Sequence, residues 1–327
     1  WTLASDIFDV RQGKRLFGLL NAGSWLSYVV AGPFSGTLAK LLGTENLYLV
    51  VAVCLFIALI IQGIILRGVK KPKAQFTDSA PQVQPPTSAL FRNRYILMVF
   101  GIAAIWRVAY FVMDAIFYNM TSIQYPNTAE SAGFIGGFFS MVGLLGFITD
   151  TFLTGRIISK YGLWAGLLTT PIALILSMSG FASIGIFASS WTLGLFWFAI
   201  AGKFNNEGLG FTLDQSASSI LYQPNSDALR PKARAIGEGI IQPAAIGIAG
   251  LLLTLLSNVL KFDSVQLSFV YIILAVGWLV LSIVLANAYP KQLVKAIHKR
   301  RFKREELINV EEINTQVLIK SLKSQHE

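Results

Sequence analysis

The sequence predicts an all-α fold, that of a polytopic membrane protein with about eight transmembrane helices. Hydrophobic residues make up 54% of the 327 residues and charged residues only 13%, against about 25% charged residues in an ordinary soluble domain. The mean hydropathy of +0.59 points the same way. Apolar runs of about 20 residues, the length that a helix needs to cross a bilayer, recur along the chain. Residues 47–66 contain no charged residue at all.

Charged or turn-forming residues bound each apolar run. An amphipathic stretch at residues 1–10 and a basic connection at residues 11–15 precede the first run, and residues 43–46 predict a tight turn after it. The expected spans are residues 16–42, 47–66, 95–118, 131–153, 163–187, 191–211, 235–257 and 266–288. We expect polar or basic connections at residues 119–130, 156–161 and 212–234.

A polar, proline-rich segment divides the chain. Residues 67–94 include Pro72, Pro81, Pro85 and Pro86 and have almost no apolar periodicity, which is typical of a flexible linker. The predicted parts are therefore residues 1–66 with two spans, the linker 67–94, residues 95–289 with six spans, and a charged tail at 290–327. The heptad-like pattern of this tail predicts a helix outside the hydrocarbon.

The basic residues are distributed unequally between the two sides of the predicted bundle. All of the 27 lysines and arginines except Lys40, Lys261, Arg107 and Lys203 lie in alternate connections, the linker or the tail. Such an excess marks the cytoplasmic side of a membrane protein. We therefore expect the linker and the tail in the cytoplasm, and the protein in the inner membrane of a bacterium.

The net charge of +10 would suggest nucleic acid as the partner of a soluble protein. Here the charge lies between apolar runs, so we expect the lipid bilayer as partner and no nucleic acid. A single cysteine and two histidines predict neither an internal disulfide nor a metal site, and we expect no cofactor. No nucleotide-binding loop, zinc motif or nucleophile elbow is present, so an enzyme is not predicted.

Two predicted spans carry ionisable residues, which are costly in a bilayer and usually face a cavity or a partner. Arg107 and Asp114 lie two helical turns apart on one face, with Tyr110 between them, and Lys203 and Glu207 are spaced for an ion pair within one helix. The cavity interpretation makes Arg107 and Lys203 candidates for an anion site. The alternatives are a helix-internal ion pair, snorkelling of the long side chains, and pairing between helices.

Glycine and proline interrupt the first span at Gly32, Pro33 and Gly36. Proline removes a helix hydrogen bond and glycine allows another helix to approach, so this segment predicts a kink or a close helix contact.

Two spans, a polar linker and six further spans resemble the later two thirds of a major facilitator superfamily transporter. Gly32-Pro33-x-x-Gly36 resembles the G-P-x-x-G-G element of that family's fifth helix, with Thr37 in place of the last glycine. The sequence opens without an initiator Met, and we interpret it as a piece covering helices five to twelve.

Two phrases are similar to those of bacterial and plastid ATP:ADP antiporters. The first is Asp6-x-x-Asp9-x-Arg11-Gln12-x-Lys14-Arg15-Leu16-Phe17-Gly18. The second comprises Leu213-Asp214-Gln215-Ser216, Leu221-Tyr222-Gln223-Pro224, Lys232-Ala233-Arg234-Ala235 and Glu238, with Ala217 and Ser218 where that family has lysine and glutamate.

The resemblance implies a transporter of a small anionic, nucleotide-like solute such as ATP or ADP, and one that works by alternating access. Arg107 and Lys203 would attract phosphate or carboxylate, Tyr110 would contact a ring, and Asp114 and Glu207 would hold the cations or carry coupled protons. Contacts of a cytoplasmic gate would come from Asp6, Arg11, Lys14, Arg15, Asp150 and Arg156. Two alternatives remain open: a scaffold or sensor acting through the cytoplasmic tail, and a transporter of an unrelated solute.

Overall fold

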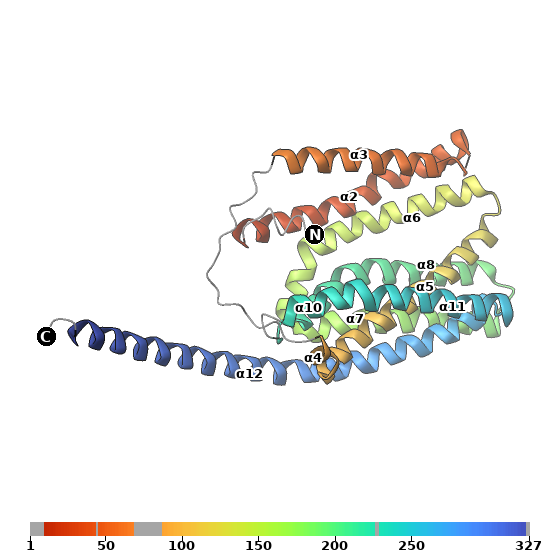
Figure 1. Cartoon of the computed structure of the whole chain (residues 1–327). Helices are drawn as coiled ribbons and strands as arrows, with labels where there is room; N and C mark the ends of the chain where they lie inside the picture. Colours follow the sequence, from red (N-terminus) through yellow and green to blue (C-terminus); the bar gives the residue numbers. More distant parts are fainter. Residues whose placement is uncertain (1–9, 44, 69–86, 226–228, 325–327) are drawn as a thin grey trace.

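The computed structural model describes residues 10–43, 45–68, 87–225 and 229–324, and every regular element in them is helical. The α-helices are α2 (Val10–Leu42), α3 (Leu47–Gly68), α4 (Ser88–Phe91), α5 (Arg94–Gln124), α6 (Thr128–Ile148), α7 (Gly155–Phe187), α8 (Thr192–Leu209), α9 (Gln215–Leu221), α10 (Leu229–Ile236), α11 (Gln242–Leu253) and α12 (Ser264–Ser324). Four π-helical turns join some of them: η1 (Thr149–Thr154), η2 (Gly210–Asp214), η3 (Gly237–Ile241) and η4 (Thr254–Val259). The long helices run roughly side by side (Figure 1).

Six helical segments of the described residues are long and apolar enough to cross a membrane, which confirms the all-α, polytopic fold class. They are Leu47–Ile65, Arg94–Gln124, Thr128–Thr154, Lys160–Phe187, Leu229–Val259 and Ser264–Ala296. Of the remaining expected spans, 16–42 lies within α2, and 191–211 corresponds to α8 and the first residues of η2. These two helices are not among the six, because polar residues interrupt their apolar stretches.

Three predicted connections are wrong in extent. The loop expected at 119–130 is short, because α5 continues to Gln124 and α6 begins at Thr128 with the Asn127 side chain capping its first turn. The basic turn expected at 156–161 is helical, and the chain instead bends at Gly162, whose φ of 74° suits glycine. The polar segment 212–234 is helical in η2, α9 and α10.

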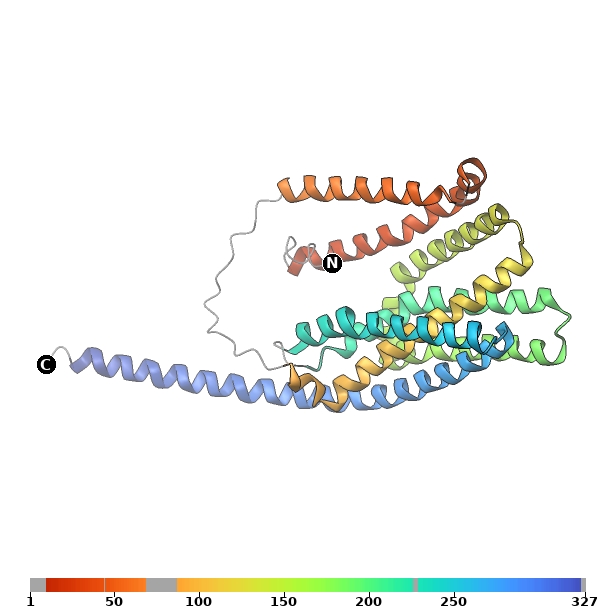
Figure 2. The same ribbon diagram turned by 45° about the vertical axis from the view of Figure 1, so that its right-hand side comes forward.

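The tail is helical, as predicted, and continues α12 without interruption through Pro290 to Ser324. Figures 1 and 2 show this helix extending well beyond the bundle. Most of the expected linker, residues 69–86, and the amphipathic stretch at 1–9 lie outside the described residues.

The contact between α2 and α6 joins the two parts of the chain that flank the linker. In both views α2 lies between α3 and α6 (Figures 1 and 2). A Cβ atom on Gly136 would overlap Ser35 Oγ and the carbonyl oxygen of Gly32, and Ser35 Oγ donates to the carbonyl of Ala132 at 3.0 Å. The close helix contact predicted for residues 32–36 is therefore confirmed, and Pro33 lies within a continuous helix.

Candidate functional site

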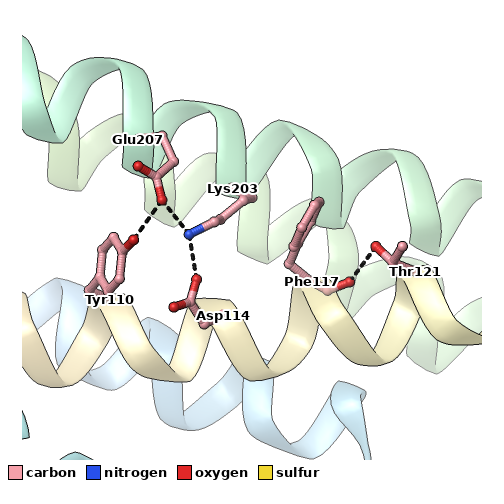
Figure 3. A network of polar contacts seen from close by, with 6 residues as sticks. All are labelled: Tyr110, Asp114, Phe117, Thr121, Lys203 and Glu207. Atoms are coloured by element: carbon pink, nitrogen blue, oxygen red, sulfur yellow. Dashed lines mark hydrogen bonds and ion pairs between the residues drawn. The ribbon is translucent and has the colours of Figure 1, made fainter. Parts of the chain in front are cut away.

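Three ionisable side chains meet between α5 and α8 and form what we call the charge cluster: Asp114, Lys203 and Glu207. Lys203 Nζ contacts both Asp114 Oδ1 and Glu207 Oε1 (Figure 3). The exposed fractions of the side chains are 0% for Lys203, 17% for Asp114 and 3% for Glu207. The helix-internal pair considered for Lys203 and Glu207 thus exists, and Asp114 adds an interhelical pair to it.

Aromatic rings enclose the charge cluster. The Tyr110 hydroxyl donates to Glu207 Oε1 at 2.7 Å, and Lys203 Nζ lies 4.4 Å from the Tyr110 ring centroid and 5.6 Å from that of Phe139. Phe139 of α6 stacks on Tyr28 of α2, with centroids 5.8 Å apart. The cluster is thus lined by α5, α6 and α8 and lies near the side of the bundle that α2 covers.

Two carboxylates share one ammonium group in this cluster. With all three groups ionised, the cluster carries one excess negative charge in a buried position. Removing charges from water costs several kcal/mol per ion, and only close pairing offsets that cost. The cation–π contact with Tyr110 adds to the stabilisation of the ammonium group, but it does not compensate the excess charge.

Arg107 does not join Asp114, although the two share a helix face. Its Nε and Nη2 donate to Gln242 Oε1 of α11 at 3.0 and 2.9 Å. Its guanidinium carbon lies 4.3 Å from the Trp106 ring centroid. The helix α5 has 31 residues, a length of about 46 Å, and Arg107 lies near its midpoint. Arg107 is therefore a half-buried cation. Among the described residues, its side chain donates hydrogen bonds to a neutral amide, that of Gln242.

A cavity of about 800 Å³ opens beside Arg107. It lies between α5, the η2–α9 segment and the α10–η3–α11 segment, towards the end of the bundle where α5 begins. Its lining includes Trp106, Arg107, Asp214 and Gln242. Sequence reasoning missed Asp214 and Gln242 as site residues, although Asp214 stands in the second quoted phrase.

The outer part of the cavity carries an ion pair and a buried phenol. Arg234 Nε and Glu238 Oε1 are 2.7 Å apart, but both side chains are exposed, so their pair contributes little to stability. Burial, reinforced by the Glu238 charge, raises the pKa of Tyr222 to about 12. Tyr222 is thus a neutral hydroxyl at physiological pH.

The predicted gate residues are only partly described. Asp6 lies outside the described residues, and Arg11, Lys14 and Arg15 lie on the first turns of α2, where only the backbone is described. Asp150 is half-buried in η1, and Arg156 is exposed at the start of α7. The η1 turn and the start of α7 lie at the same end of the bundle as the start of α2 (Figure 1). The gate role of these residues stays a prediction.

The fold and the site together define an integral membrane protein of the polytopic helical class, with buried charges and a cavity that Arg107 lines. The sequence profile of the Major Facilitator Superfamily matches residues 2–254. The chain belongs to this superfamily.

Named relatives are similar to this chain at low identity. "ADP,ATP carrier protein 1" of Chlamydia trachomatis serovar D is 22% identical over 274 residues, covering 72% of this chain and 51% of the relative. "ADP,ATP carrier protein 2" of Chlamydia pneumoniae is 21% identical over 347 residues, covering 91% and 64%. The chain spans about half the length of the first of these relatives. No solved structure matches it significantly.

Proposed function

We propose that this protein transports a small anionic, nucleotide-like solute across the membrane by alternating access. Membership of the Major Facilitator Superfamily and the similarity to ADP,ATP carriers support a transport function. The proposal depends most on the position of Arg107. This cation lies near the midpoint of α5, lines a cavity of about 800 Å³ and donates its hydrogen bonds to the neutral amide of Gln242. Transporters of this kind usually bind their solute near the bilayer midplane, and Arg107 lies near the midpoint of α5.

Arg107 has the chemistry that an anion site requires. A guanidinium group carries five N–H donors in a planar fork, and two of its nitrogens, Nε and Nη2, donate to Gln242. The remaining donors suit bidentate binding of phosphate or carboxylate. Because the partner of Arg107 is neutral, its positive charge is available to an anion. Trp106, whose ring stacks on the guanidinium, preorganises it for this contact.

Lys203 has a second role in the proposal. Asp114 and Glu207 neutralise it in this structure, so Lys203 becomes available to an anion only when one carboxylate releases it. Uptake of a proton by the charge cluster would remove the excess negative charge and free the ammonium group. The cluster is therefore proposed to couple protons to the movement of the solute, with Tyr110 positioning Glu207.

The helix contacts support a proposed division of the chain into two moving parts. We assign α2 and α3 to one half, the residues from α5 to α12 to the other, and residues 67–94 to the central linker between them. The α2–α6 contact would then be the surface on which the halves rock. The uneven distribution of basic residues supports a cytoplasmic linker and tail, in the inner membrane of a bacterium.

Exchange of labelled ATP and ADP in proteoliposomes tests the proposal directly. The protein expressed from its complete reading frame should exchange the nucleotides, and Arg107→Ala should abolish the exchange. Arg92→Ala is the matched control, because Arg92 is an exposed arginine at the connection before α5. Exchange of no phosphate-bearing anion would refute the anionic version, and unchanged exchange in Arg107→Ala would refute the site.

One observation favours the scaffold or sensor alternative: α12 continues as a single helix far beyond the bundle. In that case no solute would move, and removal of the residues after 290 would abolish function while Arg107→Ala would leave it intact.

A further inference from the structure

A line of polar side chains follows one wall of the cavity beside Arg107. Arg234, Glu238 and Gln242 line the cavity at intervals of four residues, and Gln242 accepts the hydrogen bonds of Arg107 at the inner end. The segment that carries these three residues, Leu229–Val259, is one helical run. Arg234 lies eight residues before Gln242, which corresponds to roughly 12 Å along a helix. The line therefore has a cation at each end, Arg234 and Arg107.

The π-helical turn η3 keeps the three side chains in line. In a regular α-helix, residues four apart drift around the axis by about 40° at each step. The turn η3 lies between Arg234 and Gln242, and a π-helical turn holds more residues than an α-helical one, which offsets this drift. Gly237 also lets η3 pack closely on Tyr222, because a Cβ on this glycine would lie 2.6 Å from the tyrosine hydroxyl. The local helix geometry thus aligns these polar groups along the cavity.

The line runs from the surface into the bundle. The side chains of Arg234 and Glu238 are 58% and 56% exposed, whereas Gln242 and Arg107 are half-buried. In both views α10, which carries Arg234, lies at the end of the bundle where α5 begins (Figures 1 and 2). The proposed topology places this end in the cytoplasm, so Arg234 stands at the cytoplasmic mouth of the cavity.

The charged groups of the lining differ in how firmly they are paired. Arg234 Nε donates to Glu238 Oε1 at 2.7 Å, but this bond uses one of the five N–H donors of the guanidinium group. Because the pair is exposed, it contributes little to stability, and an incoming anion can replace Glu238 at small cost. Burial raises the pKa of Asp214 to about 8, so this carboxyl is largely uncharged at physiological pH. An anion that enters the mouth thus meets Arg234 first and then Arg107, whose charge no carboxylate of the lining offsets.

We propose that Arg234 is a second anion-binding residue, which captures the solute at the mouth of the cavity before Arg107 binds it deeper inside. Glu238 competes with the solute for Arg234 and so limits how strongly the mouth retains it. This proposal rests on the proposed function and deepens it, because the two arginines bind the same phosphate or carboxylate group in succession. A charge at the rim of a site acts mainly on the rate of association, and salt weakens its effect.

Uptake of labelled ADP from each side of the membrane tests the proposal. Inside-out vesicles from a bacterium that expresses the complete reading frame present the cytoplasmic mouth, and intact cells present the opposite face. Arg234→Gln should raise the KM at least about threefold in inside-out vesicles, with an unchanged maximal rate and an unchanged KM in intact cells. Glu238→Gln should lower the KM in inside-out vesicles, because it frees Arg234. Higher ionic strength should reduce both effects.

Arg92→Gln is the matched control, because Arg92 is an exposed arginine before α5 and lies outside the set of described residues that line the cavity. An unchanged KM for Arg234→Gln in inside-out vesicles would overturn the inference, and so would an equal rise in both preparations or in Arg92→Gln. If Arg234→Gln does not reach the membrane, the lower KM expected for Glu238→Gln still decides.

The same experiment separates this inference from the function on which it rests. A wild type that takes up no ADP would overturn the proposed nucleotide transport as well. Uptake that depends on Arg107 but not on Arg234 would overturn this inference alone.

Discussion

Replacement of Lys203 by methionine should destabilise the bundle strongly. Methionine approximates the length of the lysine stem but leaves Asp114 and Glu207 buried beside each other without their shared cation. Removing one partner of a buried ion pair costs about 3–5 kcal/mol. At about 2–4 °C per kcal/mol for a domain of 150–250 residues, the denaturation temperature should fall by roughly 6–20 °C.

The measurement is thermal denaturation in detergent, followed by size-exclusion chromatography of the heated samples. The triple variant Lys203→Met, Asp114→Asn, Glu207→Gln removes all three charges and should recover most of the lost stability. An unchanged denaturation temperature in Lys203→Met, or an equal loss in the triple variant, would refute the reasoning.

Three further changes follow from the same contacts. Gly136→Ala should weaken the α2–α6 contact and lower the denaturation temperature, while Gly137→Ala, whose Cβ meets no atom within 4 Å, should not; equal effects would contradict the packing. In Gln242→Glu the new carboxylate should pair with Arg107 and compete with an anion for the guanidinium group. Pyrophosphate binding should therefore weaken at least about tenfold, and unchanged binding would count against the anion site. Tyr110→Phe removes a hydrogen bond to a charged group and should cost about 1.5–3 kcal/mol in thermal denaturation, less than Lys203→Met; no loss would show that the bond is weak.

The sequence predicts the membrane class and the residues of the charge cluster for a simple reason. Hydrophobic length and charge within a span are local properties, and an ionisable residue in an apolar run needs a partner wherever the run packs. Asp114, Lys203 and Glu207 could be identified in this way. The helix boundaries were less predictable. The basic residues 156–161 suggested a turn, but they are helical, and α7 bends only after them, at Gly162.

The choice of partner was not predictable from spacing. Arg107 and Asp114 share a face, yet Arg107 binds Gln242, which lies 135 residues away in the sequence, and Asp114 binds Lys203, 89 residues away. Such pairs depend on how the helices pack against one another. No local pattern in the sequence reveals this packing. Asp214 was missed for the same reason, since it follows an apolar run in a polar segment and becomes buried only when η2 packs against α5 and α7.

The central claim is that Arg107 binds the anionic part of a transported solute. Uptake of labelled ADP into proteoliposomes loaded with ATP, measured for the wild type, Arg107→Ala and the control Arg92→Ala, tests it most directly. We predict uptake by the wild type and by Arg92→Ala that depends on internal ATP, and none by Arg107→Ala. Equal uptake by all three proteins would contradict the account.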